Sequence, residues 1–151
     1  MTTTTEGLPA AFAAIVEDFN AVGAPDRLQM LLEFSRNLPA LPERYAEHPE
    51  LLEPVPECQS PIFVVAEVDG TGGDAIVHLH FQAPQESPTT SGFAGILHEG
   101  LDGLTAAEVL AVPADVSDRL GLAQAVSPLR LRGMAGMLGR IKRQVREKSA
   151  A

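Results

Sequence analysis

The chain has 151 residues, of which 45% are hydrophobic and 21% are charged, and its formal net charge is −9. This length and balance predict one globular domain with a substantial core and exclude a membrane-spanning helix, since no run of about 18 apolar residues occurs. A mostly acidic chain also excludes general nucleic-acid binding, because phosphate contacts need basic side chains clustered on one face.

Two helices are predicted at the start of the domain. Apolar residues at helical spacing place the first from about Pro9 to Asn20. Gly23 separates it from a second helix, for which Pro25 suits the first turn. The pair Leu38-Pro39 then ends the second helix, because proline is not tolerated in a helix interior.

The segment from Ala40 to Cys58 is predicted to be a long ordered loop. Its prolines forbid a continuous helix, and its glutamates make it acidic. Loops of this length in a compact domain are usually functional. We interpret the acidic run as a solvated loop, with recognition of a basic partner surface as the alternative.

A β-hairpin is predicted next. The run from Ile62 to Val68 indicates a nearly fully buried strand, residues 69–74 form a turn, and Ala75 to Phe81 return as a second strand. In the return strand Val77, Leu79 and Phe81 share one face, and Ile76, His78 and His80 share the other.

The remainder is predicted to be helical. A helix capped by Thr89 or Thr90 runs to Leu101, and a capping box at residues 105–108 opens a short helix to Val112. Another short helix ends at Gly121, and Ser127 caps the last and longest helix. This order predicts the α+β class, a small antiparallel sheet packed against several helices. Residues 1–7 are expected to be disordered, 8–148 to form one domain, and 149–151 to be a tail.

Cys58 is the only cysteine, and it lies between Pro56 and Pro61. One thiol cannot close an intramolecular disulfide or supply the ligands of a typical zinc or iron–sulfur site. The flanking prolines restrict the backbone and hold the thiol in a defined place. A lone cysteine without the basic, apolar start of a secretory signal points to the reducing cytoplasm.

The charge is unevenly distributed. Residues 1–126 hold 4 basic and 19 acidic side chains, net −15, whereas residues 127–151 hold 7 basic and 1 acidic, net +6. We interpret the basic end as a solvated helix face, with contact to an acidic surface as the alternative.

Two motifs stand out, Glu57-Cys58-Gln59-Ser60 before a strand and the run from Ser127 to Met134 that opens the last helix. Together they resemble the SufE family of sulfur-acceptor proteins in iron–sulfur cluster assembly. The resemblance extends from about Leu8 to Arg146. It implies a fold similar to that of the iron–sulfur scaffold proteins.

The resemblance also implies a function. Cys58 would accept persulfide sulfur from a cysteine desulfurase of the SufS type, stimulate that enzyme, and deliver sulfur for cluster assembly. Gln59 and Ser60 would shape its loop, and Arg130 would match an arginine near it. A cluster scaffold or a rhodanese-like sulfurtransferase are possible further partners. Such a protein is a sulfur carrier that performs at most a sulfurtransferase half-reaction. It needs no cofactor, metal or membrane.

The chain departs from the family pattern in two places. Glu57 stands where members usually have glycine, and a Ser-Asp-Ala element is replaced by residues 86–90. The Glu57 carboxylate is expected to favour the neutral Cys58 thiol by charge repulsion, and Arg130, if close, to favour the thiolate. Ile62 and Phe63 are expected to shield the persulfide.

Other functions compete with this one. In the first, the chain is a non-catalytic adaptor that binds a desulfurase or rhodanese-like protein, with Cys58 structural. In the second, Cys58 and His98 form a cysteine hydrolase, although no glycine-rich oxyanion motif adjoins the thiol. His78 and His80 with Cys58 or His98 would make a metal site, but exposed strand histidines are commoner. A cluster scaffold is excluded, because it needs about three thiolates.

Overall fold

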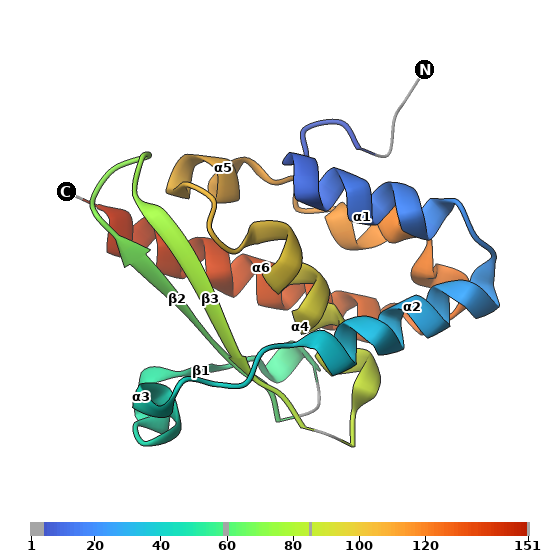
Figure 1. The fold of residues 1–151 in the computed structure, drawn as a ribbon, viewed down its shortest axis with the longest axis horizontal. Coiled ribbons are helices and arrows are strands. Elements are labelled where there is room, and N and C mark those ends of the chain that lie inside the picture. The colour runs from blue at the N-terminus through green and yellow to red at the C-terminus, as the bar shows by residue number, and fades with distance from the viewer. Residues whose placement is uncertain (1–4, 59–60, 85, 151) are drawn as a thin grey trace.

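The computed structural model describes residues 5–58, 61–84 and 86–150. Across these residues the chain forms six α-helices and a three-stranded antiparallel sheet that lies at one side of the molecule, which confirms the predicted α+β class (Figure 1). The helices are α1 Ala10–Asn20, α2 Ala24–Asn37, α3 Glu43–Ala46, α4 Pro88–Leu101, α5 Ala106–Ala111 and α6 Pro128–Ser149; the strands are β1 Glu53–Pro54, β2 Phe63–Asp69 and β3 Ile76–Gln82; the 3₁₀ turns are η1 Pro49–Leu51, η2 Pro56–Cys58, η3 Val116–Leu120 and η4 Leu122–Gln124.

The predicted hairpin is present as β2 and β3. The two strands pair in antiparallel register from Phe63 opposite Gln82 to Asp69 opposite Ile76. Side chains on a strand alternate between faces, and Val77, Leu79 and Phe81 all point into the core, as predicted.

The segment before the hairpin is more structured than the predicted loop. It contains α3, η1, the two-residue strand β1, and η2, which ends at Cys58. Strand β1 pairs with β2 through Glu53 opposite Val64. The sequence pattern missed this strand because two residues are too few to show an alternation.

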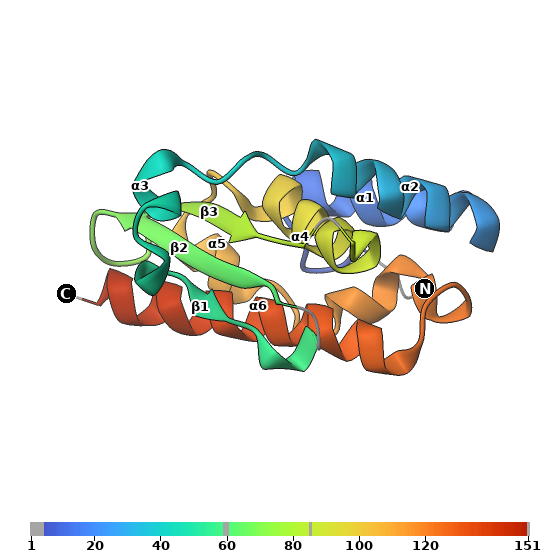
Figure 2. The same ribbon diagram turned by 90° about the horizontal axis from the view of Figure 1, so that it is seen from below.

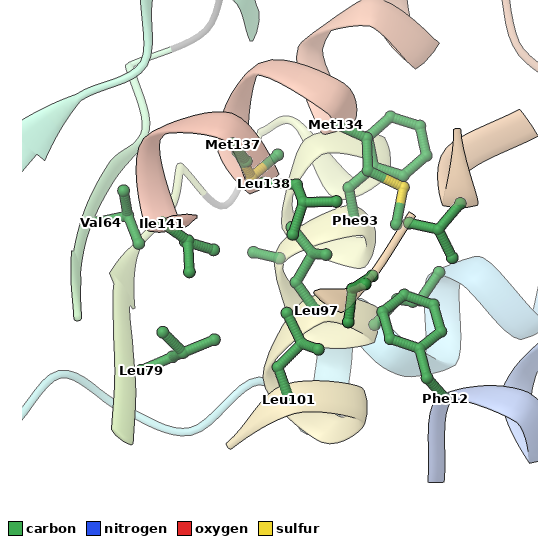
Figure 3. Close-up of a cluster of buried hydrophobic side chains, with 14 of the residues drawn as sticks. Phe12, Val64, Leu79, Phe93, Leu97, Leu101, Met134, Met137, Leu138 and Ile141 are labelled. Carbon is green, nitrogen blue, oxygen red and sulfur yellow. The ribbon is translucent and has the colours of Figure 1, made fainter. Parts of the chain in front are cut away.

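Helix α4 lies at the centre of the molecule, and α1 and α2 pack on it (Figure 1). Close approach needs glycine here: a Cβ added to Gly92 would lie 2.5 Å from the Leu31 carbonyl oxygen of α2. The predicted capping of this helix by Thr89 or Thr90 is wrong, because the helix already begins at Pro88. The core at α4 is shown in Figure 3, where Phe93 and Leu97 lie with Met134 and Leu138 of α6.

The other predicted helix boundaries are close to those observed. Thr105 and Glu108 form the predicted capping box at α5. The short helix predicted before Gly121 is η3, and Gly121 follows it in the left-handed conformation that favours glycine. At the N-terminal end Thr5–Gly7 form a turn, in which the Leu8 N–H donates to the Thr5 carbonyl oxygen.

Helix α6 runs along one side of the molecule, opposite α2 and α3 (Figure 2). Its N–H at Arg130 donates to the Ser127 hydroxyl, the predicted cap. Gln144 and Lys148 bond β2 where β1 no longer covers it: the Ala66 N–H donates to the Gln144 amide oxygen at 2.8 Å, and Lys148 donates to the Ala66 carbonyl oxygen at 2.7 Å. These side chains provide hydrogen-bond partners for backbone groups at an edge of β2 that would otherwise be unpaired.

The predicted apolar stripe of α6 is buried in the core. Its members are Leu131, Met134, Leu138, Ile141 and Val145. Within the described residues, no helix is long and apolar enough to span a bilayer.

Candidate functional site: a buried thiol against the last helix

Cys58 ends the η2 turn that follows strand β1. Its N–H donates to the Val55 carbonyl oxygen at 3.1 Å, and the Val55 N–H donates to the Ile62 carbonyl oxygen at 3.0 Å. These bonds tie the turn to the start of β2. The turn rests against the middle of α6 (Figure 2).

Gly133 of α6 is the contact surface for the thiol. The Cys58 Sγ donates to the Gly133 carbonyl oxygen at 3.4 Å. A Cβ added to Gly133 would lie 3.0 Å from the Cys58 Cα and 3.1 Å from its Sγ. The glycine therefore gives the thiol its place on the helix.

The thiol is held in its protonated form. Cys58 is only 9% exposed and belongs to the main core cluster with Val55 and Ile62. Burial, together with the negative charge of Glu57, raises the pKa of the Cys58 thiol to about 12, and the Arg140 guanidinium offsets part of this. The expected effect of Glu57 is thus present. At neutral pH the resting thiol is neutral and shielded, and it is a poor nucleophile.

A network of charged side chains lies beside the thiol and joins the turn to α6. Arg140 donates two hydrogen bonds to the Glu57 carboxylate, one from its Nε to Oε1 at 3.0 Å and one from a terminal nitrogen to Oε2 at 3.1 Å. Its remaining terminal nitrogen donates to Glu53 of β1 at 2.7 Å. Arg143 and Gln144 also donate to Glu53.

These contacts lower the pKa of both carboxyl groups. Partial burial would raise the pKa of Glu53, but the bonds from Arg143, Arg140 and Gln144 outweigh it. For Glu57 the bonds from Arg140 are the main cause. Both carboxylates are therefore ionised at neutral pH, and each faces a guanidinium.

The network pairs part of the acidic segment with the basic end of the same chain. Sequence reasoning considered solvent or a partner for each segment and missed their mutual contact. The opposite net charges of the two regions were the available signal.

The structure describes two of the four predicted site residues. Gln59 and Ser60 lie outside the described residues. Arg130 is exposed in the first turn of α6, and within the described chain the guanidinium whose charge acts on the thiol is that of Arg140. The role of Arg130 stays a prediction.

The two residues expected to shield the sulfur lie in different apolar clusters. Ile62 is buried in the same core cluster as the thiol. Phe63 instead packs in a second cluster on the opposite face of the sheet, with Tyr45 and Val65. The alternation of side chains along an extended strand explains the difference.

The histidines lie in other surroundings. His80 contacts Glu67 at 2.8 Å, whereas His78 and His98 both lie beside Asp102, at 3.5 and 3.8 Å. Burial lowers the pKa of His98. In the described part of the chain, no group of three or more His, Cys, Asp and Glu side chains could hold a metal ion.

Residues 86–90, where the resemblance leads us to expect a Ser-Asp-Ala element, lead into α4. Thr90 is buried there, as is Ser91, the next residue, whose hydroxyl donates to the Pro84 carbonyl oxygen at 3.0 Å. In this chain the segment closes the loop between β3 and α4.

Three comparisons relate this architecture to known proteins. A family model described as "SufE: Fe-S metabolism associated domain" matches residues 13–145. An uncharacterized SufE-like protein of Mycobacterium tuberculosis is 56% identical over 140 residues, which cover 93% of this chain and 94% of that protein. The SufE-like protein 1 of Arabidopsis thaliana, chloroplastic/mitochondrial, is 30% identical over 134 residues, 88% of this chain but 34% of that longer protein.

A solved structure has a similar fold. It is the solution structure of a hypothetical protein from Thermus thermophilus, with a TM-score of 0.77 and 38% identity. The match covers 93% of this chain and 96% of that one.

Proposed function

This chain belongs to the SufE family, and on that premise we propose that it is a sulfur carrier whose Cys58 takes sulfur from a cysteine desulfurase. Family membership ties the chain to iron–sulfur metabolism with a desulfurase partner. The observation that carries the finer proposal is the single thiol, held in a fixed turn and buried against α6. A persulfide kept there is protected from small reductants.

The transfer is a thiol–persulfide exchange. The Cys58 thiolate attacks the outer sulfur of the desulfurase persulfide, and a new S–S bond forms on Cys58. The S–S bond of the desulfurase persulfide breaks, and its electron pair leaves with the desulfurase cysteine as a thiolate. The proton of Cys58 passes to solvent or to that leaving thiolate. No oxidant or reductant is consumed, and the desulfurase is freed for another turnover, which stimulates it.

The lone thiol suits a carrier. A second cysteine nearby would attack the persulfide and release sulfide as a disulfide formed. Because the resting thiol is buried and protonated, the turn has to move outward before it reacts. The proposed location is the cytoplasm, where the thiol stays reduced. The proposed acceptors are a cluster scaffold or a rhodanese-like sulfurtransferase.

Intact mass spectrometry tests this proposal. The protein is mixed with an active SufS-type desulfurase, pyridoxal phosphate and cysteine. We expect a gain of about 32 Da, one sulfur atom, that dithiothreitol removes and that Cys58→Ser abolishes. No gain, with the desulfurase shown to be turning over and to bind this protein, would overturn it.

The burial of the thiol also favours a second candidate, an adaptor in which Cys58 is structural. In that case Cys58→Ala would bind the desulfurase and stimulate sulfide release as well as wild type does. The carrier proposal expects binding to persist and stimulation to disappear. The hydrolase interpretation gains no support, since in the described residues His98 lies beside Asp102 and the charges that act on the thiol are those of Glu57 and Arg140.

A further inference from the structure

Arg140 connects α6 to two separate elements next to the thiol. It binds Glu53 in β1 and Glu57 in η2, and its contact with Glu57 uses two parallel hydrogen bonds. Such fork-shaped contacts fix orientation better than single bonds do. Arg143, one turn further along α6, shares Glu53 but has no contact with Glu57 within the described chain.

A second glycine of α6 makes room for this contact. A Cβ added to Gly136 would lie 2.8 Å from the Glu57 Cβ and 2.9 Å from its Cγ. The Glu57 side chain therefore lies directly across the helix backbone on its way to Arg140. Gly133, one turn earlier, receives the thiol in the same way. The adjacent turn residues Glu57 and Cys58 thus each pack against a glycine of α6.

Glu57 immediately precedes Cys58, so the backbone of one residue moves with that of the other. While Arg140 holds Glu57, the thiol stays on the Gly133 carbonyl oxygen. Swinging the thiol outward requires that the contact between Glu57 and Arg140 break. The Glu57 side chain is 42% exposed and that of Arg140 29%, so solvent ions and a docking protein can reach the contact.

We propose that Arg140 is a positioning residue that, through Glu57, latches the Cys58 turn shut and limits access to the thiol. Among the described residues, the charged groups of this network are Glu53 in β1, Glu57 in the turn, and Arg140 and Arg143 in α6. The role of the latch in sulfur transfer rests on the proposed function, in which a partner protein has to release the latch. The effect of the latch on access to the thiol does not depend on that function.

Alkylation of the single thiol by iodoacetamide, followed by intact mass at pH 8, tests the latch without a desulfurase. We expect Arg140→Gln to accelerate alkylation about three- to tenfold, somewhat more than an exposed single ion pair gives, because the contact is bidentate. The sign is informative. Loss of the cation alone would raise the pKa of the thiol further and slow the reaction, so acceleration reports opening of the turn.

Salt and a double variant make the test specific. Raising the salt concentration from about 0.05 to about 0.5 M should speed wild type about two- to fivefold and leave Arg140→Gln nearly unchanged, since salt screens exposed pairs. Arg140→Gln should add less than about twofold acceleration on a Glu57→Gln background, because Arg140 acts through Glu57.

Arg143→Gln is the matched control, and it should alkylate within about twofold of wild type, because its carboxylate partners, Glu53 in β1 and Glu147 in α6, lie outside the turn. The latch is refuted if Arg140→Gln, with an unchanged urea midpoint, alkylates at the wild-type rate, or if Arg143→Gln matches its acceleration. The outcome is separable from the carrier proposal: faster alkylation with no sulfur gain keeps the latch and removes the carrier. Sulfur gain with unchanged alkylation does the reverse.

Discussion

The chemistry of this protein depends on how closely single residues approach one another. Glu57 places a carboxylate beside the thiol and helps to keep it protonated. Gly136 and Arg140, far along the sequence, receive that side chain. Gly133, which has no side chain, likewise leaves room for Cys58 against the helix.

Gly133→Ala should therefore disturb the thiol locally. The new methyl group would meet the Cys58 Cα at 3.0 Å and push the turn off the helix. We expect faster alkylation of Cys58 and a loss of about 1–3 kcal/mol in the free energy of unfolding, typical of overpacking. Gly139→Ala is the control, because nothing lies within 4 Å of its added Cβ. Alanine there should stabilise α6 by up to about 1 kcal/mol. Equal behaviour of the two variants in urea unfolding and alkylation would contradict this prediction.

Among the secondary-structure elements, the short helix α3 depends on one carboxylate of the sheet. Glu67 of β2 accepts hydrogen bonds from the Tyr45 hydroxyl at 2.7 Å and from Arg44 at 2.6 Å, and it contacts His80 at 2.8 Å. Partial burial would raise the pKa of Glu67, but the bonds from Tyr45, His80 and Arg44 lower it to about 2. A four-residue helix is not stable alone, so this contact and the small apolar cluster around Tyr45 hold it on the sheet.

The stability that Glu67 contributes should therefore depend on pH. Because its pKa is depressed in the folded state, the contribution is complete above the unfolded value of 4.5 and is lost as the pH falls toward about 2. Glu67→Gln should cost about 1 kcal/mol at pH 7, a value reduced for solvent screening, and the difference from wild type should shrink between about pH 5 and pH 2. Urea unfolding across this range measures it. The exposed Glu47→Gln serves as the control, and a Glu67→Gln cost that stays constant with pH would speak against the assignment.

At the scale of the whole molecule, the predictable features were those that neighbouring residues encode. The capping box at Thr105 and the cap at Ser127 were predicted correctly because their partners are three residues away. Strand β1 was missed because two residues are too few to show an alternation. The contact of Arg140 with Glu57 was missed because 83 positions separate the two charged residues. The thiol's position on Gly133 is likewise set by tertiary packing, which one sequence does not display.

The central helix α4 allows a last prediction about the global fold. Gly92 is buried, and an added Cβ would meet the Leu31 carbonyl oxygen at 2.5 Å and its Cδ1 at 2.6 Å. Helix α2 cannot yield to one side without exposing the core between α2 and α4, so we expect Gly92→Ala to lower the free energy of unfolding by about 3 kcal/mol. The Cys58 turn lies on another helix, so alkylation of the folded protein should stay at the wild-type rate. Gly92→Ala should therefore lower the free energy of unfolding strongly without changing access to the thiol, whereas Gly133→Ala should change access to the thiol. A Gly92→Ala protein as stable as wild type would show that α2 and α4 are not packed this closely.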